Sequence, residues 1–533
     1  MSPHPAHGLT MCPHLGSGGF RFVGAGRARR GAYAGSPTVR PVPIRGLAVV
    51  GMALMITWAG LRVAAAADRM HDMVIRGGRV IDPESGLDAI RDVAIDGSVV
   101  TAVSAEPLAG RDLVPADGLV VAPGFIDLHQ HAWDDQTLGL KVRDGVTAAL
   151  ELEIGTADVS GWYRGRAGGS PLHYGVAAGH APARMAELGD PPAFLPPAES
   201  RAGTVASTPD IIAGVARRIE AGLDEGAVAV GFGLAYTPAA TDEEIREIFR
   251  VAARNRASCH VHLRGRGPQA TLAAAETARL AAGVGAALHI VHAQATASGP
   301  AVHDMLRLLE RFRAADQDVT AEVYPWTAGM TEIASAIFAD GWRERLGVDY
   351  GDLQWVETGE RLTPETFARH RQQGGMVIVH RDTAASVATA VAHPLTMIAS
   401  DGLVGHPRNV GTSAMVLGRH VRETGDVTLA AAIAKLSLLP ARRLEKRVPA
   451  MRRKGRIRVG ADADLVLFDP RTVAAGASYD QPLEPSRGIV WVFVAGTAVV
   501  RGGEPVAGVF PGLPIRGAAA VSDQDEDAGR GRE

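Results

Sequence analysis

The most constraining feature of the sequence is the alternation of short apolar runs with amphipathic helical stretches across residues 123–445. "PDIIAGVARRIEAGLDEG" and "TDEEIREIFRVAARNR" show clear helical periodicity between such runs. About eight strand-then-helix units in roughly 320 residues favour an α/β fold with a (β/α)8 TIM-like barrel over an open sheet. One of these candidate strands is therefore expected to be an insertion: "GFIDLHQH", "VTAALELE", "LHYGVAAG", "AVAVGFG", "ASCHVHLR", "AALHIVHA", "DVTAEVYP", "GMVIVH" and "LTMIASD".

The two flanks of this region have a different pattern. Residues 73–122 and 455–510 alternate apolar and polar positions between Gly, Pro and Asp turns, which is typical of short antiparallel strands. The sequence therefore predicts a small β-sandwich domain built from the N- and C-terminal flanks. Residues 513–533 are polar and rich in Gly and Ala, which predicts a disordered tail.

Residues 1–67 have the composition of a leader. Basic residues precede the apolar run "GLAVVGMALMITWAG", and an Ala-x-Ala site precedes Asp68. This order is typical of a signal peptide, so we expect cleavage near Ala67 and a periplasmic or secreted protein. Arg62 ends the apolar run short of the roughly 18 to 20 residues that cross a bilayer, so no stable membrane span is expected after cleavage. Cleavage also removes Cys12 and leaves only Cys259, which excludes an intramolecular disulfide.

The charge balance argues against nucleic acid as a partner. The formal net charge is -3, and basic residues do not cluster outside the leader, so the chain has no extended positive field. Hydrophobic residues make up 46% of the chain, which is enough for a large buried core. The sequence therefore predicts a globular enzyme that acts on a small molecule.

Polar side chains interrupt the apolar runs where the candidate strands end. Because side chains alternate faces along a strand, His129 and His131 point the same way, as do His260 and His262. Paired neutral imidazoles on one face suit zinc, which favours nitrogen ligands in tetrahedral geometry. Active residues of a (β/α)8 barrel lie at the carboxyl ends of its strands, where the chain also places Glu151, Glu153, His180, His289, His292, Tyr324, His380 and Asp401.

Several longer motifs make the pattern more specific: "VVAPGFIDLHQH", "HVHLRGRG", "HIVHA", "YPWTAG", "ASDG", "HPRNVGTSAMVLGRHVRE" and "GRIRVGADADLVLFDP". Over about residues 73–505 the chain resembles the amidohydrolase superfamily, and more narrowly the N-acyl-D-amino-acid deacylases, the D-aminoacylase group. The resemblance implies a zinc-dependent hydrolase, with one or two ions, that cleaves the amide bond of N-acyl-D-amino acids. It implies that His260 and His289 are bystanders, and that the centre is built from His129, His131, His262, His292 and Asp401.

The chain departs from that group at the second strand. D-aminoacylases carry a cysteine close to the position of Ile154, and this chain has none there. Other members of the superfamily bridge two metals with a carbamylated lysine from the fourth strand. This bridge is excluded here, because no lysine lies between Lys141 and Lys435. A carboxylate remains as the candidate for the bridge between two metal ions. Glu153 is the better candidate because it lies nearer the carboxyl end of the strand. Glu151 shares that strand face as a ligand or as a partner of one.

The expected mechanism is hydroxide attack on the acyl carbonyl, because zinc lowers the pKa of a bound water to about 7. Asp401 would take the proton of that water and pass it to the leaving amine, and His180 could stabilise the oxyanion. The resemblance implies that Arg264 and Tyr324 bind the α-carboxylate of the substrate. His406 and Arg408, in the loop after Asp401, could close over the site or could equally be structural turn residues. Arg266 could supply extra positive charge for an acidic substrate such as an N-acyl-D-glutamate.

Two alternatives stay open at the level of the sequence. The chain could be a related dipeptidase, an N-acyl-L-amino-acid hydrolase or a cyclic-amide hydrolase of the same superfamily, although the missing lysine counts against the last. It could also be a binding protein that has lost catalysis. The retained histidines and Asp401 count against that second interpretation.

Overall fold

Eight parallel strands form the centre of the molecule, which confirms the predicted (β/α)8 fold. The computed structural model describes residues 69–518, and the predicted leader and residues 519–533 lie outside this range. The strand order is β16-β12-β11-β10-β9-β8-β7-β6. The strands are β6 (Phe125–Asp127), β7 (Val146–Thr156), β8 (His173–Gly179), β9 (Val230–Gly233), β10 (Ser258–His262), β11 (Ala287–Ile290), β12 (Val319–Val323) and β16 (Thr396–Ile398).

The first and last strands of this sheet meet just beyond their carboxyl ends. Gln130 forms a parallel bridge with Gly402. The backbone N–H of His131 donates to the carbonyl of Gly402 at 2.9 Å, and the N–H of Gly402 donates to the carbonyl of His129 at 3.2 Å. The "HQH" segment and the loop after β16 are therefore held side by side.

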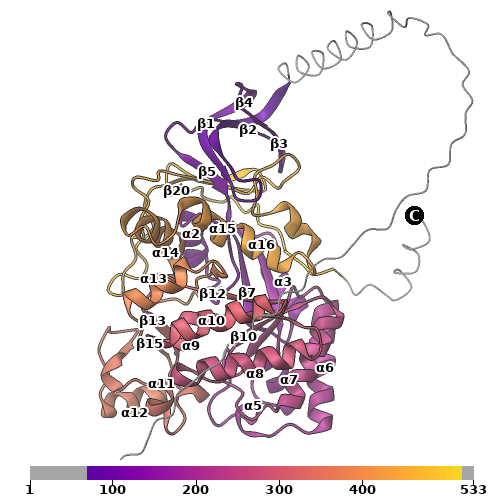
Figure 1. Cartoon of the computed structure of the whole chain (residues 1–533), viewed down its shortest axis with the longest axis vertical. Helices are drawn as coiled ribbons and strands as arrows, with labels where there is room; N and C mark the ends of the chain where they lie inside the picture. The colour runs from indigo at the N-terminus through magenta and orange to yellow at the C-terminus, as the bar shows by residue number, and fades with distance from the viewer. Residues whose placement is uncertain (1–68, 519–533) are drawn as a thin grey trace, which may run out of the picture. The chain divides into compact units, whose positions relative to one another are not determined.

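Helices cover the outside of the barrel (Figure 1). The two helices expected from periodicity are α6 (Pro209–Asp224) and α7 (Asp242–Arg254), and each begins after a threonine whose hydroxyl accepts a bond from a first-turn N–H. No helix within residues 69–518 is both long and apolar enough to cross a membrane. The other helices of the barrel are α2 (Asp135–Arg143), α3 (Val159–Arg164), α4 (His180–Leu188), α5 (Arg201–Thr204), α8 (Ala270–Ala282), α9 (Ala293–Ala297), α10 (Ala301–Ala314), α13 (Ala384–Ala392), α14 (Arg408–Met415), α15 (Leu429–Leu436) and α16 (Leu438–Leu444).

The two flanks of the chain combine in one mixed sheet of nine strands. β5 (Val120–Pro123) pairs antiparallel with β17 (Leu465–Phe468), so backbone hydrogen bonds join the N-terminal flank to the C-terminal flank. Val93 from the N-terminal flank and Phe493 from the C-terminal flank belong to one apolar cluster on this sheet. The remaining strands are β1 (Met70–Asp82), β2 (Leu87–Asp96), β3 (Val99–Ser104), β4 (Ala109–Pro115), β18 (Ile489–Val494), β19 (Thr497–Arg501) and β20 (Glu504–Pro505).

The run "GMVIVH" is the insertion. It forms β15 (Met376–His380), the middle strand of a separate sheet with the order β13-β15-β14. The insertion packs on the loops at the barrel mouth through an apolar cluster that includes Ile154, Leu195 and Tyr236. Its other elements are β13 (Ala328–Glu332), β14 (Leu353–Trp355), α11 (Trp342–Leu346) and α12 (Pro364–Gln373).

Residues 513–518 are ordered against the barrel, contrary to the expectation of a tail that is disordered from residue 513. The N–H of Ile515 donates to the carbonyl of Tyr174 at 2.7 Å, and the N–H of Leu513 donates to Nδ1 of His173 at 3.0 Å. Ile515 is 4% exposed and packs in a cluster with Val228. The reason is local, because the polar and Gly/Ala-rich composition begins only after Ile515, which still has a core to join.

Candidate metal centre

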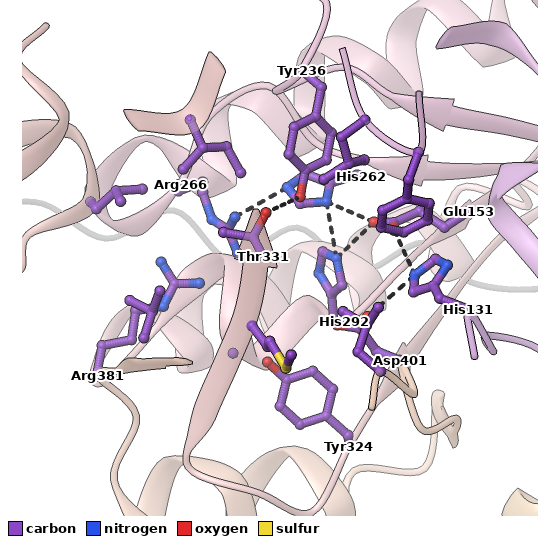
Figure 2. Close-up of a pocket in the computed structure, with 18 residues that line it drawn as sticks. His131, Glu153, Tyr236, His262, Arg266, His292, Tyr324, Thr331, Arg381 and Asp401 are labelled. Carbon is purple, nitrogen blue, oxygen red and sulfur yellow. Dashed lines mark hydrogen bonds and ion pairs between the residues drawn. The ribbon is translucent and has the colours of Figure 1, made fainter. Parts of the chain in front are cut away.

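The predicted ligands converge at the carboxyl ends of the barrel strands. They form two overlapping groups that share Glu153, and the candidate ligand atoms of each group lie within 4.8 Å of one another. Figure 2 shows Glu153 between His131 on one side and His262 and His292 on the other. The structure thus brings together His129, His131, Glu153, His262, His292 and Asp401.

The first group is centred on the two histidines that follow β6. The Nε2 atoms of His129 and His131 lie 2.9 Å apart. An Oε2 atom of Glu153 lies 3.2 Å from each of them, and Oδ1 of Asp401 lies 3.4 Å from each. Four electron-rich atoms therefore surround one point.

The outer nitrogens of both histidines are already used. Nδ1 of His129 donates to Glu322 at 2.5 Å, and Nδ1 of His131 donates to Glu151 at 2.6 Å. A carboxylate can only accept, so neutral rings present two unprotonated Nε2 atoms to each other. Burial alone would lower the pKa of His129, but Asp401, Glu153 and Glu322 raise it to about 10. The three carboxylates therefore favour a positive charge between the two histidines.

The second group lies on the other oxygen of Glu153. Oε1 of this carboxylate is 2.6 Å from Nδ1 of His262 and 3.0 Å from Nε2 of His292, and those two nitrogens are 3.2 Å apart. Burial would raise the pKa of Glu153, but His129 and His262 hold it well below its usual range. Glu153 therefore has the geometry of a bridging carboxylate, which is the role that the sequence predicted for it.

This donor set fits zinc. Imidazole nitrogens and carboxylate oxygens are typical zinc ligands. The separations of 2.9 to 3.4 Å in the first group match a tetrahedral shell with bonds of about 2 Å, whereas Oε1 of Glu153 lies closer to Nδ1 of His262, at 2.6 Å. Five of the six residues are buried, and the side chain of the sixth, His131, is only 2% exposed. The buried carboxylates among them therefore need a compensating positive charge. His129, His131, Glu153 and Asp401 would hold one ion, and Glu153, His262 and His292 would hold a second.

Asp401 is oriented by a buried arginine. Nη2 of Arg408 lies 2.9 Å from Oδ2 of Asp401, and its guanidinium lies over the ring of Tyr324 at 4.6 Å from the ring centre. Burial would raise the pKa of Asp401, but Arg408 and His129 hold it well below its usual range. Arg408 is itself fully buried and does not line the cavity. In this structure Arg408 therefore has the structural role that the sequence left open, because its charge is used on Asp401.

A small cavity opens beside the metal ligands. It has a volume of about 40 Å³ and is lined by Tyr324, as predicted, and by Tyr236, Arg266 and Arg381. In Figure 2 the two arginines lie on the side of the cavity opposite His131 and Asp401. The insertion contributes Gly329, Met330, Thr331, Ile337, Leu346 and Val379 to the lining.

Two other predicted site residues lie outside this cavity. Arg264 donates to the carbonyl of Ala240 at 2.6 Å and pairs with Asp242 at 3.6 Å. β10 ends at His262, so the alternation that would have aimed Arg264 inward stops there, and Arg266 lines the cavity instead.

His180 also departs from its predicted role. β8 ends at Gly179 and His180 is the first residue of α4. Its Nε2 donates to Glu244 at 2.6 Å, and its ring stacks on Phe232. This buried pair ties α4 to α7, so His180 is not positioned to stabilise an oxyanion.

Two residues of the site were missed by sequence reasoning. Glu322 lies on β12, and Thr320, Glu322 and Tyr324 alternate along that run, so the period that selected Tyr324 also selects Glu322. Arg381 follows the insertion strand β15, and no barrel pattern could place it. The bystanders His260 and His289 form a third group with Glu322 inside the barrel.

The same fold and chemistry occur in known proteins. The family model described as "Amidohydrolase family" matches residues 120–499. An N-acyl-D-glutamate deacylase from Alcaligenes xylosoxydans xylosoxydans is 32% identical over 506 residues, which cover 85% of this chain and 98% of that protein. A D-aminoacylase from the same organism is 28% identical over 476 residues, covering 80% and 94%.

A solved structure with bound zinc also resembles the chain. It is an N-acyl-D-glutamate deacylase from Bordetella bronchiseptica, complexed with zinc and a phosphonate inhibitor that mimics the tetrahedral intermediate. It is 26% identical with a TM-score of 0.73, and covers 84% of this chain and 100% of that one. With its barrel, its flanking sheet and its paired metal-ligand groups, the chain is a metal-dependent hydrolase that belongs to the amidohydrolase family.

Proposed function

We propose that the protein hydrolyses the amide bond of N-acyl-D-amino acids, and that its preferred substrates carry a second carboxylate in the side chain, as N-acyl-D-glutamate does. The two cavity arginines carry this proposal. The named activities of the relatives support the D configuration and the acyl group.

Arg266 and Arg381 have donors that no described residue uses. Nε of Arg266 and both Nε and Nη1 of Arg381 are buried without a hydrogen-bond partner among residues 69–518. Nη2 of Arg381 donates to the carbonyl of Ala295, and burial lowers the pKa of Arg381 to about 10, which leaves it charged at neutral pH. A buried guanidinium with unpaired N–H groups is costly unless an anion completes it. Two such groups suit a substrate with two carboxylates.

The residues of the chain define the proton path. Zinc, when bound, supplies Lewis acidity that acidifies a water molecule and polarises the acyl carbonyl. Asp401 is ionised and held by Arg408 through Oδ2, so Oδ1, which faces the metal-ligand histidines, can accept the proton of the attacking water. Asp401 then donates that proton to the amine nitrogen as the amide C–N bond breaks, because an amine leaves only when protonated. Tyr324 borders the cavity, where its hydroxyl can donate to a substrate carboxylate.

A stereochemical substrate panel tests the proposal. The chain from Asp68 onward, supplied with zinc, is assayed for release of free amino acid from N-acetyl-D- and N-acetyl-L-glutamate, aspartate and leucine. We expect turnover of the D series, with the highest kcat/KM for the dicarboxylates. Asp401→Asn, which should retain its metal, is the inactive control. Turnover of the L series alone, or of cyclic amides alone, would move the protein to another activity of the family.

The arginines are tested by two matched variants. We expect that one of the two variants, Arg266→Met or Arg381→Met, removes the preference for the glutamate substrate over the leucine substrate. The other variant should lower kcat/KM for both substrates. If the glutamate-to-leucine ratio of kcat/KM is unchanged in both variants, neither guanidinium binds the side-chain carboxylate of the substrate. We also propose that the reaction takes place after export, on the basis of the leader composition in residues 1–67.

A further inference from the structure

We propose that the anionic substrate reaches the metal centre through a second cleft, which joins the cavity at Arg266 and is lined by three arginines. This inference rests on the proposed function only in taking the substrate to be an anion. It assigns a role in substrate capture to Arg264, Arg345 and the exposed face of α8.

The cleft adjoins the cavity, because three residues line both spaces. It has a volume of about 530 Å³, compared with about 40 Å³ for the cavity at the metal ligands. Arg266, Ile337 and Leu346 line both, so they form the boundary between the two spaces. The loops after β9 and β10, helix α8 and the insertion build its walls. A small molecule bound in the cleft therefore lies against side chains that also face the cavity.

The charge of the cleft is positive. Arg264, Arg266 and Arg345 line it, and Glu276 is the one acidic residue among its lining. Arg345 donates to the carbonyls of Ala339 at 2.7 Å and Ile337 at 3.4 Å, which hold its position without neutralising it. Arg264 meets Asp242 only at 3.6 Å, and 39% of its side chain is exposed. These cations form a path toward Arg266, where the proposed carboxylate site begins.

The remaining walls of the cleft are apolar. Ala235, Pro238, Leu272 and Ala336 line it, and Leu272 is 63% exposed although it is a large hydrophobic residue. Apolar walls offer no competing acceptors for the arginines, and a cleft of one sign with low-dielectric walls focuses the field and raises the local concentration of an anion. The arrangement explains why Arg264, a residue expected to grip substrate, lies beside the cavity and not in it.

A charge pair at one exposed position tests the inference. Leu272→Lys and Leu272→Glu change the cleft in opposite directions at a helix surface that tolerates either side chain. With N-acetyl-D-glutamate at about 20 mM salt, we expect kcat/KM to be about 3- to 10-fold higher for the Lys variant than for the Glu variant. The ratio should fall toward 1 at about 500 mM salt, because exposed charges are then screened. Values of kcat should agree, since neither variant touches the metal ligands.

Val404 provides the matched control. It is also a hydrophobic residue, is 49% exposed, and follows Leu403, which lines another wall of the cavity. Val404→Lys and Val404→Glu should differ less in kcat/KM than the Leu272 pair. An equal ratio at the two positions would show a general field effect and overturn the cleft assignment, as would a Leu272 ratio near 1 at low salt.

The outcomes separate this inference from the proposed function. Turnover of N-acetyl-D-glutamate by the zinc-loaded wild type is measured first, and its absence together with absence of turnover of any other anionic amide would overturn both. Normal turnover with no charge effect at Leu272 would overturn the cleft alone. Arg264→Gln should lower kcat/KM and flatten its salt dependence, whereas Arg250→Gln on the outer face of α7 should do neither.

Discussion

At the scale of single residues, the metal centre depends on where two protons lie. Glu322 and Glu151, on different strands, accept from the outer nitrogens of His129 and His131 and so aim both Nε2 lone pairs inward. The other oxygen of Glu322 accepts from Nε2 of His289 at 3.0 Å. A carboxylate that accepts on both oxygens leaves His129 no alternative tautomer.

Glu322→Gln should weaken zinc binding by about 10- to 100-fold, because an amide in place of a ring-orienting carboxylate no longer enforces the tautomer of a ligand histidine. Competition with a chelator measures the zinc Kd, and kcat at saturating zinc should recover most of its wild-type value. Recovery by added metal distinguishes a positioning role from a loss of folding.

Glu244→Gln is the control for this variant. Glu244 is also fully buried and accepts from a histidine, His180, at 2.6 Å, but it lies outside the metal centre. The zinc Kd of the Glu244→Gln variant should match that of the wild type. A Glu322→Gln protein with unchanged zinc affinity would show that Glu322 does not position His129.

At the scale of elements, the cavity exists because the insertion between β12 and β16 covers the mouth of the barrel. Apolar packing supplies most of this contact, through Ile337, Leu346 and their neighbours. Polar links also cross it, and one of them joins the hydroxyls of Tyr236 after β9 and Thr331 on β13 at 3.1 Å. Tyr236 also lies edge-on to His262, with 4.9 Å between the ring centres. The insertion is thus tied to the same loop that supports a metal ligand.

Tyr236→Phe and Thr331→Val should each raise KM by a few-fold while zinc content stays normal, since each removes one buried hydrogen bond worth about 1 kcal/mol. The double variant should lose little more than either single variant, because the two changes remove the same bond. A double-mutant cycle on KM and on thermal stability measures this. Fully additive effects would show that the hydroxyls act independently.

At the scale of the whole molecule, the flanking sheet and the barrel are joined through Asp464, which directly precedes β17. Its carboxylate accepts from Nε2 of His173 on β8 at 3.0 Å, from Nζ of Lys454 at 2.6 Å and from the N–H of Ala495 at 2.8 Å. Burial would raise the pKa of Asp464, but His173 and Lys454 hold it far below its ordinary value of 3.8. The ionised form is therefore bound to both parts of the structure.

Asp464→Asn should lower the free energy of unfolding by about 3 kcal/mol at neutral pH, because the buried Lys454 loses the nearer of its two carboxylate partners. The folded pKa lies below the unfolded one, so the stabilisation is complete above the unfolded pKa and is lost as pH falls below about 4. Denaturant unfolding at several pH values should show the wild type and the variant converging in acid. A constant difference between them would contradict this account.

The fold and most of the metal-ligand residues could be predicted from the sequence. The barrel strands, the helices α6 and α7, and the pairing of the two flanks follow from periodicities of 2 and 3.6 residues, which any chain must respect to bury its apolar side chains. His129, His131 and Glu153 were accessible for the same reason, because alternation along a strand sets which side chains share a face. The absence of lysine between Lys141 and Lys435 pointed to Glu153, in place of a modified lysine, as the bridging ligand.

Only the tertiary structure decided what each polar side chain pairs with. Four arginines are chemically alike in the sequence but differ in their surroundings in the structure. Arg264 lines only the cleft, Arg266 lines both the cleft and the cavity, Arg381 lines only the cavity, and Arg408 holds Asp401. All four lie beyond strand ends, in loops or at a helix start, where no local period sets direction. The sequence alone determined the barrel and its zinc-binding end, because those follow from patterns within single strands. The substrate-facing arginines depend on how the insertion closes over the barrel, which is a contact between segments distant in the chain.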